Sequence, residues 1–322
     1  MAKRAPFEIH DLSVAPGTRG VVQLPLASFP TGTPVTLPVS VLHGRHKGPT
    51  IWLSAAIHGD EIGGVAIIRG VLERIKPKTL HGTIIAVPVV NVHGFLVGDR
   101  YLPDRRDLNR SFPGSAKGSL ARRIAFLLMT EVVSRCSVGI DLHTGSDGRC
   151  NLPQIRADLE DAKTLELATA FAAPVMMHSK VREGSLRGAG TKAGATVLLF
   201  EGGEALRFDK PSIRVGVAGV LRVLAALGMT DPEPPADSPS QLSAGSKWVR
   251  AARSGLALVD CSLGDVVKKG QILGLIHDSM GRRLGRLTSS VDGVVVGLKM
   301  EPLVNRGDAI IHIAAIAVQE TP

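Results

Sequence analysis

Three polar clusters in this sequence contain side chains that can bind a metal ion and move protons. Each cluster comes at the end of an apolar run, and the candidates are His58 and Glu61 in HGDE, His143 in SVGIDLH, and Glu201 in ATVLLFEGG. Zinc binds imidazole nitrogen and carboxylate oxygen, and a catalytic zinc site uses three protein ligands plus water. Two histidines and one glutamate form such a set.

The spacing of His58 and Glu61 suits a shared ion. If His58 ends a strand and Glu61 opens the next helix, the turn between them can direct both side chains at one metal, while Asp60 points away. An H-x-x-E spacing is common by chance, however. A single histidine at a strand end is more often a hydrogen-bonded polar residue than a ligand.

The elements that must position these residues alternate between strand and helix. Apolar runs predict strands at 50–57, 83–91, 137–143 and 195–203, and helical spacing predicts helices at 61–75, 118–135, 159–173 and 212–227. This alternation indicates an α/β domain with a largely parallel or mixed sheet. Ligands of such sheets bind beyond the carboxyl ends of the strands, which is where the polar clusters fall.

Changes in composition and hydrophobic pattern along the sequence divide the chain into four parts. We expect an N-terminal β-rich segment (1–47) packed on a catalytic domain (48–230), a linker (231–245) rich in Pro and Ser, and a small β domain (246–322). The last part consists of short β-like runs separated by Gly-Asp and Asp-Gly turns, which indicates an all-β module.

A fourth motif, DLNRSFPG within 100–115, lies between the halves of the candidate site. HGDE, DLNRSFPG, DLHTG and a strand ending in Glu, in this order, resemble the zinc carboxypeptidase-like superfamily, and within it the succinylglutamate desuccinylase and aspartoacylase family. The resemblance covers about 45–230. It implies an α/β fold with a mixed sheet flanked by helices, and the C-terminal part resembles the barrel-sandwich-like β domain of bacterial members.

The resemblance implies a ligand set for one zinc ion per chain. His58, Glu61 and His143 match the zinc ligands of the family, and Asp107 matches an aspartate that accepts a hydrogen bond from the first zinc-bound histidine. Such a partner fixes the ring tautomer and makes the ligand more basic. Without the resemblance, Asp107 would be interpreted as a turn cap, and Asp141 as a structural carboxylate.

The resemblance also implies residues that hold the substrate. Asn109 and Arg110 match the pair that binds the substrate carboxylate, and a guanidinium can hold a carboxylate through two hydrogen bonds. Arg100 matches an arginine that polarises the scissile carbonyl, although Arg105 or Arg106 could take that place. An alternative interpretation of these arginines is a solvated surface, and Asn109 could instead form an Asx turn.

The general base implied by the resemblance is Glu201, and Glu204 remains an alternative three residues later. Together these residues predict a zinc-dependent hydrolase that cleaves the amide bond of a small N-acyl amino acid and releases an acetyl or succinyl group. A carboxypeptidase acting on a peptide C-terminus is the alternative, because both substrates carry an α-carboxylate.

The C-terminal module raises a hypothesis of another class. GDVVKKGQILGLI and SSVDGVVVGL resemble the halves of a biotinyl or lipoyl carrier domain, or a non-catalytic ligand-binding module. A carrier needs a lysine at the hairpin tip, but the tip here, HDSMGRR (277–283), has none. We therefore expect this module to shape the entrance to the active site or to mediate assembly into a homo-oligomer.

Composition limits the partners. The chain has 322 residues and a formal net charge of +9, but no long basic run or zinc-finger spacing, so we expect no nucleic-acid partner. We expect no membrane partner, because no apolar run reaches the length needed to cross a bilayer. The three cysteines are widely spaced and odd in number, which predicts reduced thiols and a cytoplasmic location.

Overall fold

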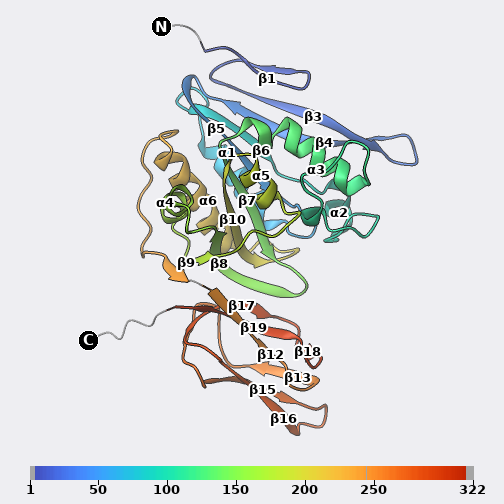
Figure 1. Ribbon diagram of the computed structural model, residues 1–322, viewed down its shortest axis with the longest axis vertical. Helices are drawn as coiled ribbons and strands as arrows, with labels where there is room; N and C mark the ends of the chain where they lie inside the picture. The colour runs from blue at the N-terminus through green and yellow to red at the C-terminus, as the bar shows by residue number, and fades with distance from the viewer. Residues whose placement is uncertain (1–3, 244, 317–322) are drawn as a thin grey trace.

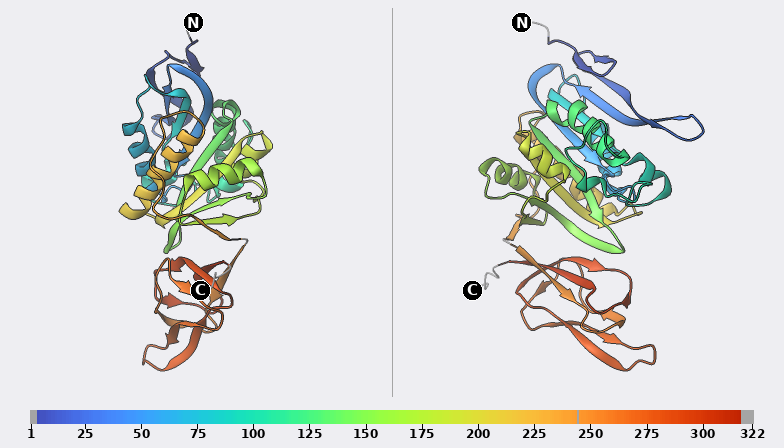
Figure 2. Two further views of the ribbon diagram at one scale, coloured as in Figure 1. Left: turned by 90° about the vertical axis from the view of Figure 1, so that its left-hand side faces the viewer. Right: turned by 45° about the vertical axis from the view of Figure 1, so that its right-hand side comes forward.

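A computed structural model describes residues 4–243 and 245–316 of the chain. Figure 1 shows a large part that carries the helices and a small C-terminal part made of strands. The two parts lie end to end along the long axis of the molecule, and the first strands, β1 (Phe7–Ile9) and β2 (Leu12–Val14), lie at the end far from the C-terminal part (Figure 2).

The large part is built on a mixed sheet. Its centre consists of neighbouring parallel strands, in the order β6 (His81–Val87), β5 (His46–Ala55), β7 (Val138–Gly145) and β10 (Thr196–Glu204). Antiparallel strands extend it on both sides: β4 (Pro34–His43) and β3 (Thr18–Ser28) beyond β6, and β8 (Arg149–Ala157) beyond β10. The predicted α/β class with a mixed sheet is confirmed.

Helices cover both faces of this sheet. One face is covered by α1 (Gly63–Arg74), α4 (Ala162–Phe171) and α6 (Lys210–Ala226), which pack on one another and on the strands. The core of the other face includes side chains of α3 (Leu120–Glu131) and α5 (Leu186–Lys192). The predicted helices are all present: α1, α3 and α4 are shorter than their apolar patterns by a few residues, whereas α6 begins two residues earlier than predicted.

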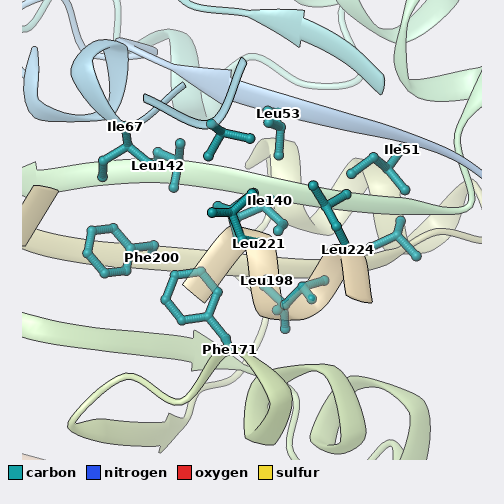
Figure 3. Packing of buried hydrophobic residues seen from close by; sticks show 14 of the residues in the cluster. Ile51, Leu53, Ile67, Ile140, Leu142, Phe171, Leu198, Phe200, Leu221 and Leu224 are labelled. Carbon is teal, nitrogen blue, oxygen red and sulfur yellow. The ribbon is translucent and has the colours of Figure 1, made fainter. Parts of the chain in front are cut away.

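Branched aliphatic side chains fill the main core, as the small aromatic content requires. Leu221 and Leu224 of α6 belong to one cluster with Ile140 and Leu142 of β7 (Figure 3). In the same cluster Phe171 of α4 packs against Phe200 of β10, with 5.5 Å between the ring centroids. Burial of such side chains contributes about 1.5–3 kcal/mol each to the free energy of folding. This packing fixes the central strands and hence the positions of the polar residues at their ends.

The C-terminal part continues the same sheet. Strand β17 (Gly293–Lys299) pairs with β8, and β19 (Ala309–Ala315) and β12 (Gly245–Arg250) follow. Strand β14 (Val266–Val267) also pairs with β17. A separate antiparallel sheet is formed by β16 (Arg283–Thr288), β15 (Ile272–His277), β13 (Gly255–Val259) and β18 (Leu303–Val304). The C-terminal part is all-β, as predicted.

Several elements were not predicted from the sequence. They are β8, β9 (Val175–His178), α2 (Val92–Val97), α5 and the short 3-10 helices at Leu108–Arg110 and Val133–Arg135. The segment expected to be a linker contains β11 (Gln241–Ser243), which pairs with β9. Cys136, Cys150 and Cys261 are free thiols. None of the helices in the described part of the chain is both long and apolar enough to span a bilayer.

Candidate active site

The candidate residues converge because they follow neighbouring parallel strands. His58 and Glu61 lie just beyond the end of β5, while His143 and Glu201 lie near the ends of β7 and β10. Glu201 is paired in register with His143. The turn after β5 packs tightly, since a Cβ on Gly59 would lie 2.1 Å from the carbonyl carbon of Gly94. Only glycine fits there, which explains the glycine of HGDE.

Glu61 lies between the two imidazoles. Its Oε1 is 2.7 Å from Nδ1 of His58, and its Oε2 is 2.7 Å from Nδ1 of His143. The backbone N–H of Thr144 also donates to Oε2 at 3.2 Å. All three candidate ligands are buried, and their donor atoms lie within 4.8 Å of one another. The predicted set of His58, Glu61 and His143 is therefore brought together by the fold.

Each histidine contacts an aspartate through its Nε2 atom, on the side of the ring away from Glu61. Nε2 of His58 lies 3.3 Å from Asp107, and Nε2 of His143 lies 2.8 Å from Asp141. The hydroxyl of Ser54 donates to the other oxygen of Asp141 at 2.7 Å. These contacts leave the Nδ1 atoms directed at Glu61. A carboxylate behind a metal-binding histidine fixes its orientation and raises its basicity.

The charges of this cluster favour a cation. Burial acts to lower the pKa of His143, but the carboxylates of Asp141 and Glu61 raise that pKa well above its ordinary value. Burial likewise acts against the charged form of Glu61, yet the two imidazoles hold the pKa of Glu61 well below its usual range. Burial acts to raise the pKa of Asp107, but the hydrogen bond with His58 outweighs this effect, so the pKa of Asp107 is lowered. Two nitrogens and a carboxylate in such surroundings fit a zinc ion.

Arg100 hydrogen-bonds both a candidate ligand, Glu61, and the aspartate that contacts His58, Asp107. Its Nη1 donates to Glu61 at 3.2 Å and to Ser146 at 2.9 Å, and its Nη2 donates to Asp107 at 3.2 Å. Arg105 and Arg106 instead lie on the surface, where they pair with Asp99 and Asp104, with side chains 74% and 59% exposed. Of the three arginines considered from the sequence, only Arg100 lines the cavity of the site.

Glu201 lies in the same cavity, with its side chain largely buried. The amide of Asn151 donates to its Oε2 at 3.0 Å, and Arg156 lies 4.0 Å from its Oε1. Burial raises the pKa of Glu201, and the charge of Arg156 only partly offsets this effect. Glu204 instead pairs with Arg207 and lines a neighbouring cavity together with Asp60. Of the two candidates for the general base, Glu201 is therefore the one that lies in the same cavity as the candidate ligands.

Asn109 and Arg110 also reach the cavity. The side-chain oxygen of Asn109 accepts a hydrogen bond from the backbone N–H of Leu186 at the start of α5. Its Nδ2 donates to no residue in the described part of the chain. Burial lowers the pKa of Arg110. The Nη1 of Arg110 donates a hydrogen bond to the backbone carbonyl of Asn109 at 2.5 Å. Asp107 caps the 3-10 helix that carries both residues, so it serves as a turn cap as well as a partner of His58.

The cavity measures about 640 Å³ and is lined by both parts of the chain. Trp248 and Arg250 of β12, with Asp308 before β19, form the wall supplied by the C-terminal part. Trp248 stacks on His312 at 4.3 Å between ring centroids, and the guanidinium of Arg149 lies 5.6 Å from the same indole. A cavity of this size suits a small molecule.

Three residues that contact a candidate ligand or the candidate base were not predicted as such from the sequence. Asp141 was interpreted as structural, but residues two apart on a strand share one face, so the D-x-H spacing places it beside His143. Asn151 and Arg156 lie on β8, a strand that was not predicted. The sequence contains no local signal that would have linked them to Glu201.

The model of a family described as the succinylglutamate desuccinylase/aspartoacylase catalytic domain matches residues 47–227, more than half of the chain. The chain belongs to this family. The match contains every residue of the site described above that lies in the large part of the fold, so the family's catalytic domain is the part that carries the histidines and glutamates.

Relatives of the family share nearly the full length of this chain. An N-alpha-acetyl-L-2,4-diaminobutyric acid deacetylase of Halomonas elongata is 28% identical, over 92% of this chain and 91% of that protein. A succinylglutamate desuccinylase/aspartoacylase from Rhodobacter sphaeroides is 27% identical, with a TM-score of 0.83 over 94% of this chain and 96% of that one. The product-bound ectoine utilization protein EutE (DoeB) of Ruegeria pomeroyi is 25% identical, with a TM-score of 0.82 over 92% and 95%. The chain is thus a hydrolase of a family of N-acyl amino acid deacylases.

Proposed function

We propose that this protein is a zinc-dependent deacylase that hydrolyses the amide bond of an N-acyl amino acid and releases an acetyl or succinyl group. The observation that carries the proposal is the Glu61 carboxylate between two buried imidazoles, 2.7 Å from each, with Glu201 in the same cavity. His58, Glu61 and His143 would hold the ion. A zinc ion bound there supplies Lewis acidity, which polarises a carbonyl group and acidifies water.

The residues of the chain divide the remaining work. Glu201 takes a proton from the attacking water and passes it to the leaving amine, and its raised pKa suits a group that must both accept and release a proton near neutral pH. The guanidinium of Arg110 and the Nδ2 of Asn109 bind the substrate's α-carboxylate, which fixes the position of the amide. Arg100 holds Glu61 and Asp107 in place and is our candidate for polarising the carbonyl.

The choice of a deacylase over a carboxypeptidase rests on the wall formed by the C-terminal part. Trp248, Arg250 and Asp308 line the cavity beside the candidate ligands, so a peptide chain has less room there than a small acyl group. The relative from Halomonas elongata is named for the deacetylation of an acetylated diamino acid. The family itself is named for succinylglutamate desuccinylase and aspartoacylase. Among acyl groups we favour acetyl, because the relative with the named substrate is a deacetylase.

The test is a screen for amide hydrolysis by the zinc-loaded protein. N-acetyl and N-succinyl amino acids, including N-alpha-acetyl-L-2,4-diaminobutyric acid, are compared with C-terminal dipeptides, and free amine is measured. We expect release from an N-acyl amino acid, and a loss of roughly a hundredfold to ten-thousandfold in kcat in Glu201→Gln. This variant keeps the shape of the side chain, and its zinc content and thermal melting serve as controls for folding.

The outcomes separate the alternatives. Hydrolysis of dipeptides but not of N-acyl amino acids would assign the protein to the carboxypeptidases. Full activity of Glu201→Gln would remove Glu201 as the base, and activity without zinc would remove the metal from the reaction.

A further inference from the structure

The C-terminal part docks on the strand next to the general base. Strand β17 pairs antiparallel with β8, with Gly297 opposite Asn151 and Leu298 opposite Cys150. The other edge of β8 pairs with β10, the strand that carries Glu201. One strand therefore separates Glu201 from the C-terminal part, and a side chain on that strand can connect the two.

Asn151 makes this connection. It is 7% exposed, and its Nδ2 donates to Oε2 of Glu201 at 3.0 Å. Among the described residues, no other side chain donates a hydrogen bond to Glu201, and Arg156 approaches its other oxygen only to 4.0 Å. The rotation of the Glu201 carboxylate therefore depends on Asn151. Oε1 is left free of side-chain hydrogen bonds and is the oxygen available for proton transfer.

Strand β17 holds Asn151 from the other side. A Cβ on Gly297 would lie 3.0 Å from Oδ1 of Asn151 and 3.2 Å from Cβ of His312 on β19. These distances are shorter than ordinary van der Waals contact, so a side chain at position 297 would press on the amide, and the backbone of β17 lies next to Asn151. The Asn151 side chain is confined between Glu201 and the C-terminal part and has little freedom to turn.

We propose that Asn151 is a positioning residue for the general base, and that β17 of the C-terminal part keeps it in place. The C-terminal part thus contributes to turnover by orienting Glu201, in addition to forming a wall of the cavity. This inference rests on the proposed function of Glu201 as the base. It gives the docking of β17 on β8 a direct role in catalysis, which a module that only narrows the entrance would not have.

The test compares Asn151→Ala, Gly297→Ala and the double variant, all zinc-loaded, with the best substrate of the screen. A hydrogen bond to a charged group is lost in Asn151→Ala, so kcat should fall on the order of tenfold to a hundredfold while KM stays within about twofold. Gly297→Ala should shift the amide by a few tenths of an ångström and lower kcat by roughly threefold to tenfold. Because both changes act through one contact, the double variant should match Asn151→Ala.

Controls separate positioning from general damage to the fold. Gly285→Ala lies in the same β part, where an added Cβ would meet no atom within 4 Å, and should leave kcat unchanged. Asn151→Leu keeps the approximate volume of the side chain but has no N–H to donate to Glu201, so it should lower kcat about as much as Asn151→Ala, with melting temperature and zinc content unchanged.

Two results would overturn the inference. One is a wild-type kcat in both Asn151 variants. The other is a double variant whose loss equals the product of the two single losses, because Gly297 would then act elsewhere. Glu201→Gln separates this failure from that of the proposed function. If it abolishes turnover while the Asn151 variants do not, only the positioning role is lost; if it retains turnover, the base itself is wrong.

Discussion

In the described part of the chain, two clusters bring histidine and carboxylate side chains close enough to share a metal ion, yet only one of them has buried side chains that neighbouring residues hold in place. His58, Glu61 and His143 form the first cluster, and Asp158, Glu160 and His178 form the second, where β8 and β9 end. In both clusters the donor atoms lie within 4.8 Å of one another. The proximity of donors therefore does not distinguish them.

The difference lies in burial and support. The side chains of the first cluster are 3–6% exposed, and each histidine is held by an aspartate on its far side. In the second cluster the His178 side chain is 24% exposed and that of Asp158 is 48% exposed, with 3.8 Å between them. Nδ1 of His178 has no hydrogen-bond partner in the described part of the chain. A metal site needs ligands that are held in place, because free side chains lose conformational entropy when they bind.

The largest effect is expected from removing a ligand of the first cluster. His143→Ala leaves Glu61 with one imidazole, so zinc binding near neutral pH and amide hydrolysis should both be lost. Metal content after dialysis and amine release measure the two effects. A His143→Ala protein that retains zinc and full turnover would contradict our assignment of the ligands.

Removing the charge behind a ligand should have a smaller effect. Asp141→Asn keeps the shape next to His143 but loses the carboxylate, which should weaken zinc binding by roughly tenfold to a hundredfold. Zinc affinity is measured by competition with a chelator. Asp158→Asn in the second cluster is the matched control and should leave this affinity unchanged. Equal effects of the two variants would show that support does not distinguish the clusters.

Zinc affinity of the first cluster should depend on pH. The carboxylate partners of His58 and His143 raise the pKa of both rings despite burial, which favours the charged form, with protons on both ring nitrogens, in the metal-free protein. Zinc must displace these protons, and its affinity should fall as the pH falls from about 8 to about 6, by up to about a hundredfold per unit when two protons are released. Chelator competition across this range checks the slope. A flat profile would mean that the rings are already neutral.

The smallest effect is expected in the second cluster. His178→Ala should change neither zinc content nor kcat, since this partly exposed histidine is not held by a buried carboxylate as His143 is. Metal analysis and amine release of the variant, side by side with the wild type, give the measurement. Loss of a bound zinc ion in His178→Ala would show that the second cluster is also a metal site, and burial and support would then not distinguish the two clusters.

The sequence was sufficient to predict the central sheet and to select the candidate ligands that the fold brings together. Apolar runs ending at His58, His143 and Glu201 marked strand ends, and neighbouring parallel strands bring such ends together. Helices α1, α3, α4 and α6 followed from apolar spacing, because one face of each packs on the sheet. These features are local in the chain, which is why they could be read from it.

The residues around the base could not be predicted, because their positions depend on long-range pairing. Strand β8 contains Pro153, which cannot donate to a sheet ladder, and the pairing of β8 with β10 shifts register between Gln154 and Asn151. The contact of β17 with β8 joins parts of the chain that are far apart in sequence. No pattern within either segment specifies that partner, so the role of Asn151 emerged only from the fold.

The most direct test of the central claim is a zinc titration of the metal-free protein that follows amine release from the best N-acyl amino acid substrate. Our account predicts that the rate rises in proportion to zinc and stops rising at about one ion per chain, held by His58, Glu61 and His143. A rate that is already maximal without zinc, or that continues to rise to a second equivalent, would contradict it.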